Sequence, residues 1–213
     1  MKYIPKDSSR EPESVKQWKR LAANDPNYGY KFLRSDERKD LLKALIEEQG
    51  NICCYCGMAI DRENSHVEHL YTQTSHPHLS LEYTNLLASC GISETYRPAY
   101  NSELHCQEHC GRKRQHSDLS IKPTDYDCES KFRYTGEGEI LPKDDLSVKS
   151  LNLNYTELRK LRKAAIEAAK SLLEEDFSNE EIDLFVKSFE KRDHDGKFQP
   201  FCFVITYFLK SYI

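Results

Sequence analysis

The sequence lacks any long apolar run. A membrane span needs about 18 consecutive apolar residues, and no stretch of this 213-residue chain approaches that length. The opening residues, MKYIPKDSSREPES, are polar and lack the apolar segment of a secretory signal. Hydrophobic residues make up 38% and charged residues 31% of the chain, as in soluble globular proteins. We therefore expect a soluble protein that works in the cytoplasm.

The sequence also lacks a net positive charge. Its formal net charge is −4, which does not by itself indicate a nucleic-acid binder. The charge is unevenly distributed, because residues 41–110 are acidic and a short basic run, GRKRQH, follows directly at 111–116. A nuclease with an acidic metal site and a basic rim has this pattern, and so do many ordinary surfaces. The weak overall basicity indicates that any binding of nucleic acid is shared with a partner protein.

Internal repeats and low-complexity tracts are absent, and the chain divides into three parts. Residues 1–34 form an arm with one short helix, ESVKQWKRLAAND. Residues 35–120 hold the helix SDERKDLLKALIEEQG, for which Ser35 is the expected N-cap and Gly50 the end, followed by the candidate site. Residues 121–213 form a hairpin and then helices. We expect an α+β, mainly helical fold, with the three parts in one continuous domain.

The third part carries the clearest local signals. CESKFRYTGEGEILP predicts a hairpin with TGEGE as its turn. YTELRKLRKAAIEAAKSLLEED predicts a helix, and SNEEIDLFVKSFEKR predicts another that opens with a capping box between Ser178 and Glu181. The apolar segment FQPFCFVITYFLKSYI predicts a helix rather than a strand.

Cysteine, by contrast, is abundant, with eight in the chain and six of them between residues 53 and 110. In a reducing compartment, clustered cysteines more often hold a metal than form disulfides. The C-x2-C at 53–56, with Gly57 directly after it, is the pattern of a zinc knuckle. Cys54 lies between ligands and is excluded. The alternative is a set of unrelated buried cysteines. The expected zinc ligands are Cys53, Cys56, Cys90 and either Cys110 or Cys106.

The segment SHVEHL at 65–70 indicates a second site. His66 and Glu68 alternate on a strand and so share a face, and His69 follows at the strand end. Histidine and carboxylate are ligands for a catalytic divalent ion, and a histidine that is not bound to metal can act as a general base. The alternative is a solvated hairpin with incidental charges.

The order of these motifs resembles a known family. C-x2-C, then Glu-His-Leu, then Asn-Leu with a cysteine five residues after the asparagine, then HCGRK, is similar to the cysteine-stapled form of the HNH endonuclease motif. That motif is a ββα-metal unit of a hairpin and a helix. Together with the closing FQPFCFVITYFLK, these segments resemble the PtuB family, the HNH nuclease subunit of Septu-type antiphage defence systems, which is also found with some retrons.

The resemblance implies a role for each residue. His69 would be the general base that activates water, and Glu68 would be a ligand of Mg²⁺ or another divalent cation. Asn85 would hold the loop and orient His69. Cys53, Cys56, Cys90 and Cys110 would hold a structural zinc. Cys110 is preferred to Cys106 because HCGRK resembles the start of the helix in the family.

Gly111 stands where the family has the histidine that names its motif, so the third ligand of the catalytic metal is open. The candidates are His66, His109 and His116, and His66 is preferred because it shares a strand face with Glu68. The basic residues Arg112, Lys113 and Arg114 would contact a phosphate backbone at the helix start, or else form a solvated helix face.

The leading hypothesis is a metal-dependent HNH endonuclease that acts within an antiphage complex on DNA, or on an RNA such as tRNA. The resemblance implies a PtuA-like ATPase as partner and, where a retron is present, its reverse transcriptase and RNA/DNA. One alternative is a non-catalytic zinc-stapled scaffold. Another is a stand-alone restriction-type nuclease.

Overall fold

A computed structural model describes residues 1–25, 28–91, 108–114, 118–173 and 177–212. Seven α-helices are found in these ranges: α1 (Glu13–Ala22), α2 (Ser35–Glu48), α3 (Gly111–Arg114), α4 (Leu146–Ser150), α5 (Thr156–Lys170), α6 (Asn179–Glu190) and α7 (Cys202–Leu209). The strands are β1 (Ser65–His69), β2 (Leu86–Cys90), β3 (Arg133–Tyr134) and β4 (Ile140–Leu141). Short 3-10 helices lie at Ser8–Arg10, Tyr30–Phe32, Pro77–Leu79, Tyr83–Asn85, Cys128–Lys131 and Lys210–Tyr212.

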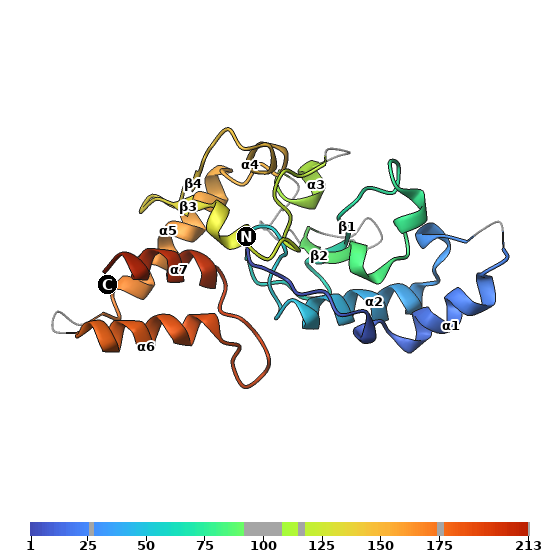
Figure 1. Cartoon of the computed structure of the whole chain (residues 1–213), viewed down its shortest axis with the longest axis horizontal. Helices are drawn as coiled ribbons and strands as arrows, with labels where there is room; N and C mark the ends of the chain where they lie inside the picture. Colours follow the sequence, from blue (N-terminus) through green and yellow to red (C-terminus); the bar gives the residue numbers. More distant parts are fainter. Residues whose placement is uncertain (26–27, 92–107, 115–117, 174–176, 213) are drawn as a thin grey trace.

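The molecule is elongated, with α1 and α2 toward one end, α6 and α7 toward the other, and the N-terminus near the middle (Figure 1). At one end the antiparallel pair β1–β2 packs on α2, and α1 packs beside α2. At the other end α7 packs against α5, α6 and β3. The larger of two hydrophobic clusters among the described residues runs from Met1 to Val204 and takes buried side chains from all three parts of the chain, and the smaller one lies between α5, α6 and α7. The fold is thus of the expected mixed α+β kind.

Helix α2 lies directly before the C-x2-C turn in the chain. Leu41 and Leu45 on its apolar face are fully buried, and Leu42 is partly buried. The prediction that Ser35 caps this helix is wrong, because Ser35 is its first residue and no side-chain bond caps the end. Instead, the carboxylate of Glu37 accepts hydrogen bonds from Arg34. At the other end Gly50 has a φ of 67°, a left-handed conformation that glycine adopts without strain and that ends the helix.

The β1–β2 pair is short and is buried by its surroundings. Its register places His66 opposite Ser89 and Glu68 opposite Leu87. Gln49, just after α2, lies against the outer side of β2: its amide donates to the carbonyl of Ala88 (2.8 Å), and its oxygen accepts from the Ala88 N–H (2.6 Å). Gln49 thereby fixes the sheet to α2.

The C-terminal part follows its sequence signals closely. The hairpin β3–β4 forms around the predicted turn, and the capping box between Ser178 and Glu181 is present with both reciprocal bonds. The apolar segment near the end is helical, as expected, in α7. Helix α5 ends at Lys170, earlier than the sequence predicts. Among the described residues, no helix combines the length and the apolar character that crossing a bilayer demands.

Candidate metal centres and catalytic residues

Four cysteines meet in the interior, where the C-x2-C turn, the end of β2 and the start of α3 come together. The Sγ atoms of Cys53, Cys56, Cys90 and Cys110 all lie within 4.8 Å of one another, and each residue is at most 1% exposed. Local backbone bonds shape this pocket: the Gly57 N–H donates to the Cys53 carbonyl at 3.1 Å, and the Cys110 N–H donates to the Leu151 carbonyl at 2.8 Å.

The donor set fits zinc. The Sγ atoms of Cys56 and Cys90 are 3.7 Å apart. Zn–S bonds of about 2.3 Å in a tetrahedron separate sulfurs by about 3.8 Å, whereas a disulfide needs about 2.05 Å. Burial by itself raises the pKa of Cys53, but hydrogen bonds from the neighbouring thiols bring it well below its usual value. Burial and the nearby Cys53 thiolate instead raise the pKa of Cys110. These four buried sulfurs could hold a metal such as zinc.

Three competing ligands were expected from the sequence, and the structure describes one of them. Cys106 lies outside the described residues, and so does His116. His109 is buried beside the cysteine cluster, with its Nδ1 3.2 Å from the Cys110 Sγ and 3.8 Å from the Cys90 Sγ. His109 therefore borders the cysteine cluster rather than the face of β1 that carries Glu68.

The second candidate centre lies on β1. The Nε2 atom of His66 is 3.6 Å from Oε2 of Glu68. The other ring nitrogen, Nδ1, lies 3.3 Å from the Gly91 carbonyl, which can only accept. We assign a proton to Nδ1 on that ground, and Nε2 is the ring atom that faces Glu68. A second hydrogen bond of this kind orients most histidines that bind metals.

Glu68 is buried but remains ionised. Burial alone would raise the pKa of this carboxyl, yet His66, Arg114 and Tyr55 together hold it below its usual value. Tyr55 Oη and Arg114 Nη1 both donate to Oε1, each at 3.0 Å. Its second oxygen, Oε2, faces His66. The carboxylate is therefore a fixed anion with one oxygen turned to the histidine.

Gly111 packs directly against these two side chains. A Cβ built on Gly111 would lie 2.8 Å from His66 Nε2 and closer still to Glu68 Oε2. Both atoms therefore border the position that a side chain at 111 would occupy. A separation of 3.6 Å suits two ligands that each lie about 2.1 Å from one cation. The residues present fit a divalent ion, although within the described ranges no third histidine, cysteine or carboxylate joins them.

His69 is held on the other side of the strand end. Its Nε2 lies 3.0 Å from the Ser80 carbonyl, and its Nδ1 lies 3.5 Å from Gln73 Nε2. Because the carbonyl only accepts, Nε2 carries the proton and Nδ1 is the basic nitrogen. Burial is the main cause that lowers the pKa of His69, against the opposing effects of Ser80 and Glu68. The ring, 8% exposed, is therefore neutral at pH 7 and able to accept a proton.

Asn85 secures the loop that carries Ser80. Its side-chain oxygen accepts from the Tyr71 N–H at 2.7 Å, and its amide donates to the carbonyls of Tyr71 and Leu79, both at 3.0 Å. Leu79 directly precedes Ser80, which binds the His69 ring. Asn85 thus acts on His69 through the loop backbone rather than by direct contact.

The basic run at α3 is divided between the surface and the interior. Lys113 is exposed, with its Nζ 3.7 Å from a carboxylate oxygen of Glu108, and Arg112 is half-buried. The expectation that Arg114 contacts phosphate is corrected, because its side chain is only 1% exposed and bonds to Glu68 and to main-chain carbonyls. Neither Tyr55 nor the inward direction of Arg114 could be inferred from the sequence. A four-residue helix shows no periodicity that would identify its buried face.

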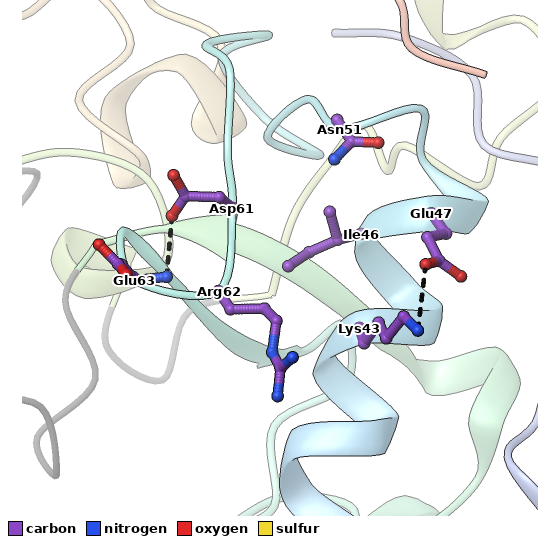
Figure 2. A pocket seen from close by; sticks show the side chains of 7 residues that line it. All are labelled: Lys43, Ile46, Glu47, Asn51, Asp61, Arg62 and Glu63. Carbon is purple, nitrogen blue, oxygen red and sulfur yellow. Dashed lines mark hydrogen bonds and ion pairs between the residues drawn. The ribbon is translucent and has the colours of Figure 1, made fainter. Parts of the chain in front are cut away.

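A cavity of about 430 Å³ lies elsewhere, between α2 and the turn at 61–63 (Figure 2). Ile46 faces it among charged side chains. Asp61 accepts a bond from the Glu63 N–H, which keeps the turn closed, and Lys43 pairs with Glu47. None of the candidate metal ligands lines this cavity. Its lining residues are Lys43, Ile46, Glu47, Asn51, Asp61, Arg62 and Glu63.

The fold and the site together define a small, mainly helical α+β protein that contains a buried cluster of four cysteines and, on β1, a histidine–carboxylate pair. One curated relative is the protein named "Retron Vc95 putative HNH endonuclease" from Vibrio cholerae serotype O1 biovar El Tor. It is 28% identical over 132 residues, which cover 56% of this chain and 60% of the relative. The chain therefore aligns with less than two thirds of that protein's length. No protein-family model matches the sequence.

Proposed function

We propose that this protein is a metal-dependent HNH endonuclease that hydrolyses phosphodiester bonds. The relative from Vibrio cholerae carries that activity in its name, within a retron. The observation that carries the proposal is the arrangement along β1. His66 and Glu68 meet beside Gly111, and the next residue, His69, has an unprotonated Nδ1 that can accept a proton.

His69 is the general base of this proposal. With Nε2–H bound to the Ser80 carbonyl, its Nδ1 would take a proton from water as the water attacks phosphorus. Asn85 would keep the loop, and with it Ser80, in place while the ring becomes charged. The ring is neutral before the step because burial lowers its pKa.

His66 and Glu68 would hold a divalent cation, Mg²⁺ or a similar ion. When bound, the ion would stabilise the negative charge that builds on the phosphate and on the leaving oxygen. Water and the substrate phosphate would complete the coordination that two protein ligands begin. Cys53, Cys56, Cys90 and Cys110 would hold zinc as a scaffold, because four thiolates leave no open position for a substrate.

The substrate class and the partner remain part of this proposal. The same phosphodiester chemistry applies to DNA and to an RNA such as tRNA. Half-buried Arg112 and exposed Lys113 would contact the phosphate backbone. A net charge of −4 favours nucleic-acid binding that is shared with a partner protein. This fits an effector subunit bound to a PtuA-like ATPase in antiphage defence. A retron reverse transcriptase with its RNA/DNA would belong to the same complex.

Replacing the base tests the proposal directly. His69→Ala should lower cleavage of plasmid DNA or tRNA by roughly 100-fold or more, the usual contribution of a general base. Zinc content should stay at the wild-type level, because His69 does not border the cysteines. Single-turnover cleavage with Mg²⁺ or Mn²⁺, by the chain alone and in its native complex, is the measurement.

His194→Ala is the matched control, since that histidine is 90% exposed in a distant turn. It should cleave like the wild type. If His69→Ala keeps full activity while zinc remains bound, the enzyme proposal fails and a zinc-stapled scaffold is the better description. Full activity of a monomer without any ATPase would instead favour a stand-alone nuclease.

A further inference from the structure

The guanidinium of Arg114 lies in the interior, between α3 and the end of β1. Its Nη1 donates to Tyr55 Oη at 3.1 Å, to Glu68 Oε1 at 3.0 Å and to the His69 carbonyl at 3.1 Å. Its Nη2 donates to the Leu70 carbonyl at 2.5 Å. One side chain thus joins the candidate metal ligand to the backbone of the candidate base.

These bonds distinguish the two oxygens of Glu68. Oε1 receives a hydrogen bond from Arg114 and another from Tyr55. Oε2 receives neither of them and faces His66 Nε2 at 3.6 Å. A carboxylate that is held through one oxygen cannot rotate, so the other oxygen keeps one direction. That direction is toward His66 and the backbone of Gly111.

The same guanidinium fixes the point where the chain leaves β1. It holds the carbonyls of His69 and Leu70, and the His69 ring is held separately by Ser80. The backbone and the ring of His69 are therefore anchored from two different elements, α3 and the 70–85 loop.

We propose that Arg114 is a positioning residue, which keeps one oxygen of Glu68 available for a divalent cation and fixes the strand end that carries His69. This inference rests on the proposed function and deepens it. Arginine is required because its planar fork reaches several acceptors at once. Lysine carries the same charge, but it has a single ammonium and a different geometry.

Binding of Mn²⁺ to the zinc-loaded protein tests this role without any substrate. Arg114→Lys keeps the charge and removes the fork, so we expect the Mn²⁺ dissociation constant to rise roughly 10-fold or more, the usual effect of losing an outer partner of a metal ligand. Tyr55→Phe removes the other donor to Oε1 and should weaken Mn²⁺ binding in the same direction. The electron paramagnetic resonance signal of free Mn²⁺, measured in a titration, gives both values.

Arg162→Lys is the matched control. Arg162 is also fully buried and also donates to main-chain carbonyls, those of Gly138 and Leu153, but not to Glu68. We expect it to lower the melting temperature and to leave Mn²⁺ binding as in the wild type. Wild-type Mn²⁺ affinity in both Arg114→Lys and Tyr55→Phe would overturn the positioning role. If Arg114→Lys does not fold, Tyr55→Phe decides alone.

Glu68→Gln separates this inference from the proposed function. If the wild type binds Mn²⁺ no better than Glu68→Gln, the proposed metal site fails and the role of Arg114 falls with it. If Glu68→Gln abolishes binding while Arg114→Lys and Tyr55→Phe do not weaken it, the metal site stands and only the positioning role is rejected.

Discussion

At the scale of single residues, the candidate site depends on a missing side chain. Gly111 follows Cys110 and begins α3, and its Cα faces both His66 Nε2 and Glu68 Oε2. Any larger residue would occupy the volume between these two atoms. The glycine is therefore part of the site, although it has no functional group of its own.

Gly111→Ala should abolish divalent-ion binding at this site while leaving the zinc in place. The added Cβ would lie 2.8 Å from His66 Nε2 and would displace Glu68. Isothermal titration with Mn²⁺, alongside zinc analysis, measures both effects. Gly136→Ala is the control, since its nearest neighbour, Phe208, lies at an ordinary 3.8 Å. Unchanged Mn²⁺ affinity in Gly111→Ala would mean that the ion does not occupy this space.

Some of the site could be predicted at this scale, and some could not. Strand periodicity puts His66 and Glu68 on one face, and the structure has them 3.6 Å apart. The Ser80 carbonyl that holds His69 could not be foreseen, because backbone acceptors leave no mark on a sequence. The inward direction of Arg114 could not be foreseen either, because a run of three basic residues has the same sequence pattern whether it faces solvent or the interior.

At the scale of elements, α2 is a helix whose extent is predicted correctly although its N-terminal cap is not. The helix extends over the expected residues and ends before Gly50, because its apolar face and the terminal glycine are strong signals. The predicted cap is absent, because no side-chain bond caps this end of the helix, and Arg34 instead donates to the Glu37 carboxylate. Side-chain bonds at helix ends depend on neighbours that periodicity does not describe.

Glu37→Gln should destabilise the protein at neutral pH and not in acid. The hydrogen bond from Arg34 holds the pKa of Glu37 below its usual value. The carboxylate therefore adds stability above its unfolded pKa of about 4.3 and loses it as the pH falls through the lower folded value. Because Arg34 is mostly exposed, the loss at pH 7 should be about 0.5 kcal/mol.

Urea unfolding between acid and neutral pH measures this difference. Glu47→Gln, at the opposite end of α2 and 60% exposed, is the control and should change stability little at any pH. If Glu37→Gln is still less stable than the wild type at a pH below the folded-state pKa of Glu37, the loss of stability comes from packing and not from charge.

At the scale of the whole molecule, the cysteine cluster joins distant parts of the chain. The Cys110 N–H binds the Leu151 carbonyl, and the Phe201 N–H binds the Gly57 carbonyl beside the C-x2-C turn. A Cβ on Gly57 would strike the ring of Phe203 at 2.5 Å, so the turn packs tightly on α7. A metal at the four sulfurs would therefore stabilise both ends of the elongated molecule.

Cys53→Ala and Cys54→Ala form a matched pair, because both residues are adjacent and 1% exposed. Cys54→Ala should retain zinc and lose about 1 kcal/mol, as ordinary buried truncations do. Cys53→Ala should lose zinc and melt far lower, because metal binding is coupled to folding. Metal analysis and thermal melting, with and without a chelator, measure both. Equal zinc content and equal melting in the two variants would contradict a zinc staple.

Gln49 has one more consequence, for how the protein behaves at high concentration. A two-stranded sheet normally presents unpaired backbone groups on its outer edges, which can recruit strands from other molecules and start aggregation. Here the Ala88 N–H and carbonyl in the middle of β2 are already bonded to the Gln49 amide, and the Cys54 N–H shares the same carbonyl. The amide side chain substitutes for a third strand and blocks edge-to-edge addition at that position.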